Sequence, residues 1–125
     1  MKKLALLLCF GPLLMSSTCE DDDTEPQIIC TTEARAGLNV TVTDAANNAT
    51  LFEGVSVIAT EGQYSEILEP IAGNAAFAGA WERAGYYVLT VNKEGYQTAI
   101  SDLIVVNSDQ CHVIPRVLTI SLQPE

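Results

Sequence analysis

Histidine is nearly absent from this sequence, which holds only His112 among its 125 residues. A catalytic zinc site uses three protein ligands, commonly histidines, and keeps one position open for water. One histidine does not meet that need, and a site built from Cys30, Cys111 and His112 has no clear fourth ligand. The sequence also lacks a Gly-x-Ser-x-Gly turn that would carry a serine nucleophile. We therefore expect no metal, no cofactor and no catalysis, and a hydrolase that uses His112 is the least favoured alternative.

Basic residues are also scarce. Six Lys and Arg stand against 16 Asp and Glu, so the formal net charge is −10. A surface of this sign repels phosphate backbones and anionic headgroups. Nucleic acid is therefore excluded as the expected partner, and attachment to a membrane would have to come from a lipid.

The chain has only one extended apolar run, residues 4–15, which follows the basic pair Lys2-Lys3. The run is too short to span a bilayer as a helix. A basic start, a short apolar run and a small-residue exit at residues 16–18 are typical of a secretory signal. We assign residues 1–19 to such a signal segment, against the alternative of a short buried helix. Its removal would leave four basic and 16 acidic residues, a net charge of −12.

Cys19 stands at the end of that segment, where a bacterial lipoprotein signal places the cysteine that is acylated and becomes the mature N-terminus. The segment resembles such a signal. Residues 20–29 begin with EDDDTEPQ, which is too polar and acidic to pack, so they predict a disordered acidic tether. An acidic run behind a lipid-bearing cysteine is similar to the surface-export signals of some Gram-negative lipoproteins. The alternative is an ordinary cleaved signal with Cys19 as a spare thiol.

The remaining cysteines concern the domain itself. Cys9 lies inside the signal segment, so Cys30 and Cys111 are left after Cys19 is set aside. Export would place them in an oxidising compartment, where an even number of thiols usually pairs. We expect a disulfide between Cys30 and Cys111 that ties the two ends of the domain together. A pair of free thiols is the rival.

From residue 38 onward the apolar pattern has a period of two, which predicts half-buried strands. The predicted strands are residues 38–44, 55–60, 64–68, 74–81, 86–91, 96–100, 103–106 and a last strand within 111–122. The alanine-rich stretch 74–81 is also compatible with a helix, but its flanking glycines favour a strand. About seven short strands with turns between them predict one all-β sandwich domain over residues 30–125.

Two segments carry a resemblance to a known family. Residues 40–59, VTVTDAANNATLFEGVSVIA, and residues 84–98, AGYYVLTVNKEGYQT, resemble the opening and a later strand of carboxypeptidase regulatory-like domains. The closing VLTISL at 117–122 is similar to the last strand of that family. The resemblance implies a transthyretin-like, seven-stranded, Greek-key-type β-sandwich that is non-catalytic and serves as an accessory to other proteins. The residues that carry the pattern are Asp44, Gly54, Gly85, Tyr87, Gly95 and Tyr96.

The pattern residues have physical roles that can be stated in advance. Gly85 and Gly95 would allow positive φ in the turns that bracket one strand. Tyr87 and Tyr96 would bury their rings while each hydroxyl stays at a wet edge or bonds to backbone.

Three further features of the sequence lead to expectations about single side chains. Trp81, the only tryptophan, either packs at the core or rim or is exposed to bind a sugar or a protein. Arg83 and Glu82 are expected to pair at the surface. Cys111 and His112 should point to opposite faces of the last strand, which leaves His112 exposed or hydrogen-bonded.

These observations lead to two main hypotheses. The first is a non-catalytic lipoprotein of the outer membrane or cell surface that binds or supports a protein or carbohydrate partner. The second is a secreted or periplasmic module that binds a small ligand or carbohydrate through Trp81.

Overall fold

The computed structural model describes residues 28–125, and residues 1–27 lie outside the description. The predicted signal segment, Cys19 and most of the predicted tether therefore fall outside the described residues. The elements in chain order are β2 (Ala36–Asp44), β3 (Thr50–Leu51), β4 (Ser56–Glu61), β5 (Tyr64–Ile67), β6 (Glu69–Ile71), the 3-10 turn η3 (Ala72–Asn74), β7 (Ala76–Trp81), β8 (Gly85–Asn92), β9 (Ala99–Ile100), β10 (Ile104–Val106) and β11 (Arg116–Leu122).

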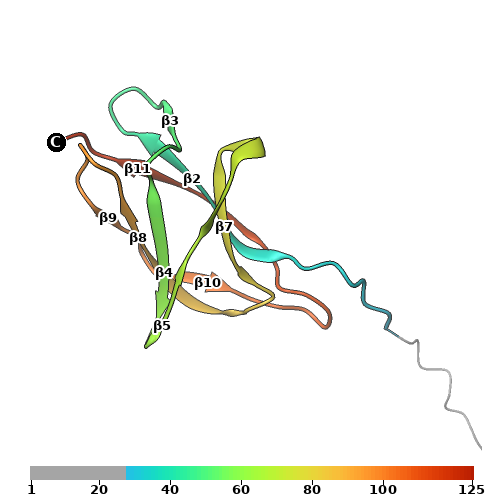
Figure 1. Ribbon diagram of the computed structural model, residues 1–125. Coiled ribbons are helices and arrows are strands. Elements are labelled where there is room, and N and C mark those ends of the chain that lie inside the picture. The colour runs from blue at the N-terminus through green and yellow to red at the C-terminus, as the bar shows by residue number, and fades with distance from the viewer. Residues whose placement is uncertain (1–27) are drawn as a thin grey trace, which may run out of the picture.

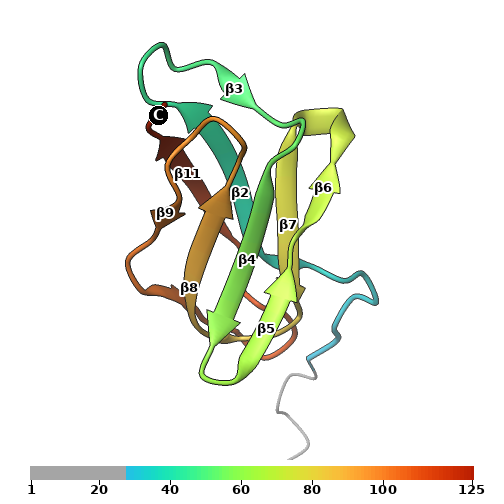
Figure 2. The ribbon, with the colours of Figure 1, turned by 60° about the vertical axis from the view of Figure 1, so that its left-hand side comes forward.

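The strands form two sheets that pack as a β-sandwich (Figure 2). The first sheet has the order β10-β8-β4-β5, with β9 also paired to β8, and all its pairs are antiparallel. The second has the order β11-β2-β7-β6, with β3 also paired to β2, and its β11–β2 pair is parallel. The all-β prediction is therefore confirmed.

The core lies between the sheets and follows from the alternation in the sequence. On β2, Leu38, Val40 and Val42 are fully buried, whereas the intervening Asn39 and Thr41 are partly exposed. The inward residues of β8 and β4, together with Phe77 on β7, complete the apolar cluster. Each fully buried aliphatic side chain contributes about 1.5–3 kcal/mol relative to an exposed one. The period-two pattern thus predicted the core face correctly.

Two boundaries differ from the sequence prediction. The last strand begins at Arg116 and not at Cys111, because Pro115 has no N–H for a sheet and residues 107–113 bond among themselves instead. Tyr96 lies outside the expected strand at 96–100 and makes an isolated bridge with Pro124, so only Ala99–Ile100 forms a strand there. The stretch 74–81 is a strand from Ala76 onward, as predicted.

The sandwich has two distinct ends (Figure 1). An N-terminal arm, residues 28–35, enters β2 at one end, and the last residues of the chain lie at the other. Because β11 runs parallel to β2, it leads from the arm end to the far end. Among the described residues, no helix has the length and apolar character needed to cross a membrane.

Candidate functional site

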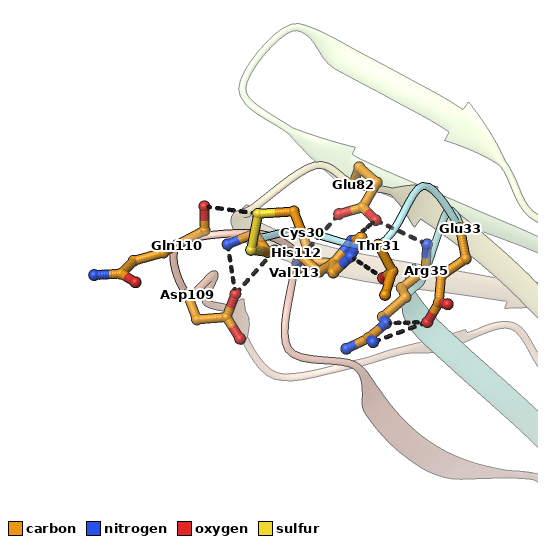
Figure 3. A network of polar contacts seen from close by, with 10 residues as sticks. Cys30, Thr31, Glu33, Arg35, Glu82, Asp109, Gln110, His112 and Val113 are labelled. Atoms are coloured by element: carbon orange, nitrogen blue, oxygen red, sulfur yellow. Dashed lines mark hydrogen bonds and ion pairs between the residues drawn. A yellow bond between two sulfur atoms is a disulfide. The ribbon is translucent and has the colours of Figure 1, made fainter. Parts of the chain in front are cut away.

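The N-terminal arm, the turn between β7 and β8, and the loop at 107–113 meet at one end of the sandwich (Figure 3). Cys30 and Cys111 form a disulfide there, with Cα atoms 5.3 Å apart and a sequence separation of 81. The predicted disulfide is therefore confirmed. We call this region the disulfide junction, and its residues are Cys30, Thr31, Arg35, Glu82, Asp109, Cys111, His112 and Val113.

Glu82 is the centre of the disulfide junction. Its carboxylate accepts hydrogen bonds from the backbone N–H of Arg35 at 3.0 Å, from the backbone N–H of Val113 at 3.0 Å and from Nδ1 of His112 at 2.5 Å. Its own N–H donates to the carbonyl of Arg35 at 2.9 Å. One side chain thus joins the arm, the β7–β8 turn and the 107–113 loop. The hydrogen bond from His112 is the largest cause that lowers the pKa of Glu82, and the bond from the N–H of Val113 is the second.

His112 follows Cys111 in the loop and is only 7 % exposed. Besides its bond to Glu82, its Nε2 lies 2.9 Å from Oγ1 of Thr31 on the arm. The sequence placed His112 on a strand, pointing away from Cys111. That prediction is wrong, because both residues lie in the loop before β11, although the expected hydrogen bonding of His112 is present.

Asp109 shapes the loop that carries Cys111 and His112. Its Oδ1 accepts the backbone N–H groups of Cys111 at 2.8 Å and of His112 at 2.9 Å. These two bonds lower the pKa of Asp109, and the bond from His112 has the larger effect. A short polar side chain that bonds to amides two and three residues ahead stabilises a turn.

Thr31, His112 and Glu82 form a hydroxyl–imidazole–carboxylate series like that of a hydrolase triad. Acyl transfer also needs amide donors that point at the developing oxyanion. The N–H groups of Cys111 and His112 are already bonded to Asp109, and that of Val113 is bonded to Glu82. The arrangement is therefore suited to holding three segments together.

An open hollow of about 530 Å³ lies over the disulfide junction. Its lining includes the hydroxyls of Thr31, Thr32 and Ser108 and the carboxylates of Glu33, Glu82 and Asp109. Trp81 does not line it, although it directly precedes Glu82 and is 45 % exposed at the end of β7. The tryptophan is therefore not in the core but partly exposed at the rim of the sandwich.

Arg83 does not pair with Glu82, contrary to the sequence prediction. Its Nη1 donates to Glu61 and to the hydroxyl of Tyr87, each at 2.8 Å. The guanidinium also lies over the ring of Tyr64, 3.5 Å from the ring centre. The hydrogen bond to Tyr87 is the largest cause that raises the pKa of Arg83, and the bond to Glu61 is the second. Glu82 is bound by the arm and the loop instead, because the β7–β8 turn directs the two neighbouring side chains to different places.

The residues of the family pattern do not gather at one site. Tyr87, fully buried on β8 near the disulfide junction, donates its hydroxyl proton to the carbonyl of Arg83 at 2.8 Å, which confirms the expected bond to backbone. At the far end, Tyr96 donates to Oδ2 of Asp44 at 2.7 Å. This bond is the main cause that lowers the pKa of Asp44 and raises that of Tyr96. These residues stabilise both ends of the sandwich.

The glycines of the pattern have two different roles. Gly54 and Gly95 have positive φ, 74° and 88°, as only glycine adopts readily. Gly85 does not have positive φ, so the prediction for that residue is wrong. It is constrained by space, because a Cβ there would lie 2.7 Å from the carboxylate of Glu61.

Replacing Gly85 with alanine should destabilise the fold by about 1–3 kcal/mol, the usual cost of overpacking. The added methyl would push against a Glu61 carboxylate that is fixed by the N–H of Tyr86 and by Arg83. Gly73→Ala is the matched control, since no atom lies within 4 Å of the position that its added methyl would take. Urea unfolding of both variants checks the prediction, and equal midpoints would contradict it.

Glu82→Gln should destabilise the protein in a pH-dependent way. The pKa of Glu82 is lowered in the folded state from its ordinary 4.5, so ionised Glu82 stabilises the fold above that pH. This contribution is lost as the pH falls through the lowered folded-state value. The gap in urea midpoint between parent and variant should therefore be full near neutral pH and close in acid. Glu94→Gln, at an exposed turn, is the control, and a gap that stays constant into acid would refute the assignment.

The sequence did not single out Glu82 or Thr31 as functional residues. Glu82 has φ of 50°, a left-handed conformation that is uncommon for a residue with a side chain. No local pattern signals that conformation, and its three hydrogen-bond partners lie about 30 or more positions away in the chain.

Together, the fold and the disulfide junction define a small all-β sandwich domain. A disulfide joins its N-terminal arm to the loop before its last strand. Comparison of the sequence with protein-family models and with curated proteins finds no match.

Proposed function

We propose that this protein is an exported, lipid-anchored accessory module of the outer membrane or cell surface. Its sandwich would bind or support a protein or carbohydrate partner without catalysing a reaction. The observation that carries the proposal is the Cys30–Cys111 disulfide. Disulfides of this structural kind persist in oxidising compartments and are rare in a reducing cytosol.

The N-terminal sequence supports the anchored form of the proposal. A basic start, an apolar run, Cys19 and an acidic stretch follow one another, as in lipoprotein signals. Two or more acyl chains on Cys19 would hold the domain durably at a membrane, where one chain would not. The acidic stretch before Cys30 would then act as a solvated tether.

The architecture supports a carboxypeptidase regulatory-like, transthyretin-like domain with Greek-key-type connections. β5 and β6 are separated by Leu68 alone and link the two sheets. If they count as one strand and the two-residue β3 and β9 are set aside, seven strands remain. The bond of Tyr87 to backbone fits the role that this pattern implies, whereas Tyr96 bonds to the side chain of Asp44 and not to backbone.

A non-catalytic role is supported by the chemistry of the disulfide junction. The backbone N–H groups of Cys111, His112 and Val113 donate to the carboxylates of Asp109 and Glu82 within the protein. Amides engaged in this way do not point at a developing oxyanion, which acyl transfer would need. We assign Thr31, His112 and Glu82 to holding the arm in place.

The second candidate function is a secreted or periplasmic module that binds a small ligand or carbohydrate. The exposed Trp81, close in sequence to the hydroxyl- and carboxylate-lined hollow, favours it. Loss of glycan binding in Trp81→Ala, with Tyr86→Ala as an exposed-aromatic control, would support this alternative.

Mass spectrometry of the mature protein from its native membranes tests the first proposal. We expect an N-terminus at Cys19 that carries acyl chains, and recovery in the outer-membrane fraction. Cys19→Ala should remain unprocessed. An unmodified N-terminus located beyond Cys19 would overturn the lipid anchor and leave the secreted module.

A further inference from the structure

β11 leaves the middle of one edge of the sandwich open. At the start of the strand Nη1 of Arg116 donates to the carbonyl of Val105, and just past its end residues 95–97 pair with residues 123–125. β11 is the outermost strand of its sheet, and within residues 28–125 it pairs only with β2. At its end, the carbonyl of Leu122 accepts the N–H of Ala45 beside β2, while the carbonyl of Gln123 accepts the N–H of Gln97 on the opposite side. Backbone groups alternate in direction along a strand. Val117, Thr119 and Ser121 therefore direct their N–H and C=O groups toward the open edge.

The other described edges carry features that discourage pairing with a further strand. β6 contains Glu69 and Pro70, and β5 contains Glu66. β9 and β10 are only two and three residues long. Charges, proline and shortness are the usual protections of sheet edges. β11 has seven residues, no acidic group and no proline, and its only charge is Arg116 at the start.

Apolar surface accompanies this edge. Val117 is 80 % exposed on the outer face of β11. A groove of about 260 Å³ runs beside the strand and is lined by residues 101–104 on one side and by Arg116, Leu118, Thr119 and Ile120 on the other. An edge of unpaired backbone groups with apolar side chains beside it is suited to an added β-strand.

We propose that β11 pairs with β11 of a second copy of this chain, antiparallel and with its two-fold axis at Thr119. Thr119 would then face Thr119 of the second copy, and Val117 would face Ser121. Each of these is a pair that exchanges both N–H···O bonds, because these residues direct their groups outward. The two sheets would join into one continuous sheet across the dimer.

The strand is self-complementary in this register, which favours a second copy as the occupant. Leu118 comes opposite Ile120, so no like charges meet along the strand. Arg116 of each copy comes opposite Leu122 of the other, at opposite ends of the paired strands. Arg116 is the only charged side chain of β11, so this register brings no like charges together on a protein whose net charge of −10 otherwise opposes association.

Cysteine crosslinking of the full chain tests the register. Thr119 pairs with Thr41 across the parallel ladder, so the two residues share a face and a level. In the dimer, the two Thr119 Cα atoms would lie about 5.5 Å apart. The two Thr41 Cα atoms would lie three strand spacings apart, about 14 Å. A short bismaleimide should link Thr119→Cys at least about tenfold faster than the matched control Thr41→Cys, because only the first holds its thiols within reach.

The parent chain, treated in parallel, accounts for native cysteines, and the linked peptide must contain two copies of residue 119. Sedimentation provides the second measurement. Parent and Thr119→Val should show the dimer mass, and Thr119→Pro, which lacks the edge N–H, should show the monomer mass. A Thr119→Cys rate no higher than that of Thr41→Cys overturns the proposal. So does a parent chain that stays monomeric at all concentrations, or a dimer that persists in a folded Thr119→Pro protein.

Discussion

Replacing both Cys30 and Cys111 with serine should lower the free energy of unfolding by about 4–5 kcal/mol. The bridge spans 81 positions, and the entropy that such a loop removes from the unfolded chain corresponds to that amount at 25 °C. Small domains are stable by only about 5–15 kcal/mol in total. With a typical urea slope near 2 kcal/mol per molar, the unfolding midpoint should fall by roughly 2 M.

Reduction provides the control for this prediction. The oxidised parent should lose a similar amount of stability in reductant, while the double serine variant should not respond. Changing both cysteines together avoids a lone thiol that could pair with Cys19. Intact mass of the parent should rise by two hydrogens on reduction, with the bridge mapped to Cys30 and Cys111. A double variant that unfolds at the same midpoint as the oxidised parent would show that the bridge does not stabilise the domain.

Tyr87→Ala should destabilise the protein by about 3–5 kcal/mol, the usual range for removing a buried aromatic ring. Tyr87 is fully buried, and its hydroxyl bonds to both the carbonyl and the guanidinium of Arg83. The loss therefore combines a cavity in the core with two missing hydrogen bonds. Urea unfolding with far-UV circular dichroism measures it.

Tyr86 supplies a matched control in the same strand. It is adjacent to Tyr87 on β8, points to the other face and is 58 % exposed. Tyr86→Ala should cost less than about 1 kcal/mol. Tyr87→Phe, which keeps the ring and removes only the hydroxyl, should cost about 1–2 kcal/mol. Similar losses for Tyr86→Ala and Tyr87→Ala would contradict the burial assigned to β8.

Much of the fold could be predicted because it depends on local alternation. Residues 38–44 and 86–91 alternate apolar and polar side chains, and in the structure they are the two long strands that face each other across the core. The disulfide was predictable for a different reason. Once the two cysteines in and at the end of the apparent signal segment are set aside, only Cys30 and Cys111 remain to pair.

The position of the last strand was not predictable to the residue. Apolar or β-branched residues predominate from Val113 to Leu122, and the sequence prediction extended the last strand back across Pro115 to Cys111. The loop extends to Pro115 because Asp109 bonds to the amides of Cys111 and His112 and because Pro115 itself has no N–H for the sheet. That competition between a side chain and the sheet for the same N–H groups depends on the folded loop.

The sequence by itself determined the all-β class, the core faces of the main strands and the one possible disulfide of the domain. Each of these follows from composition or from neighbours within a few residues. Only the tertiary structure decided that Glu82 binds the arm and the loop, that Arg83 turns to Glu61 and Tyr87, and that β11 remains an open edge. These features join segments that are tens of residues apart, and folding brings such segments together through a core that no local pattern encodes.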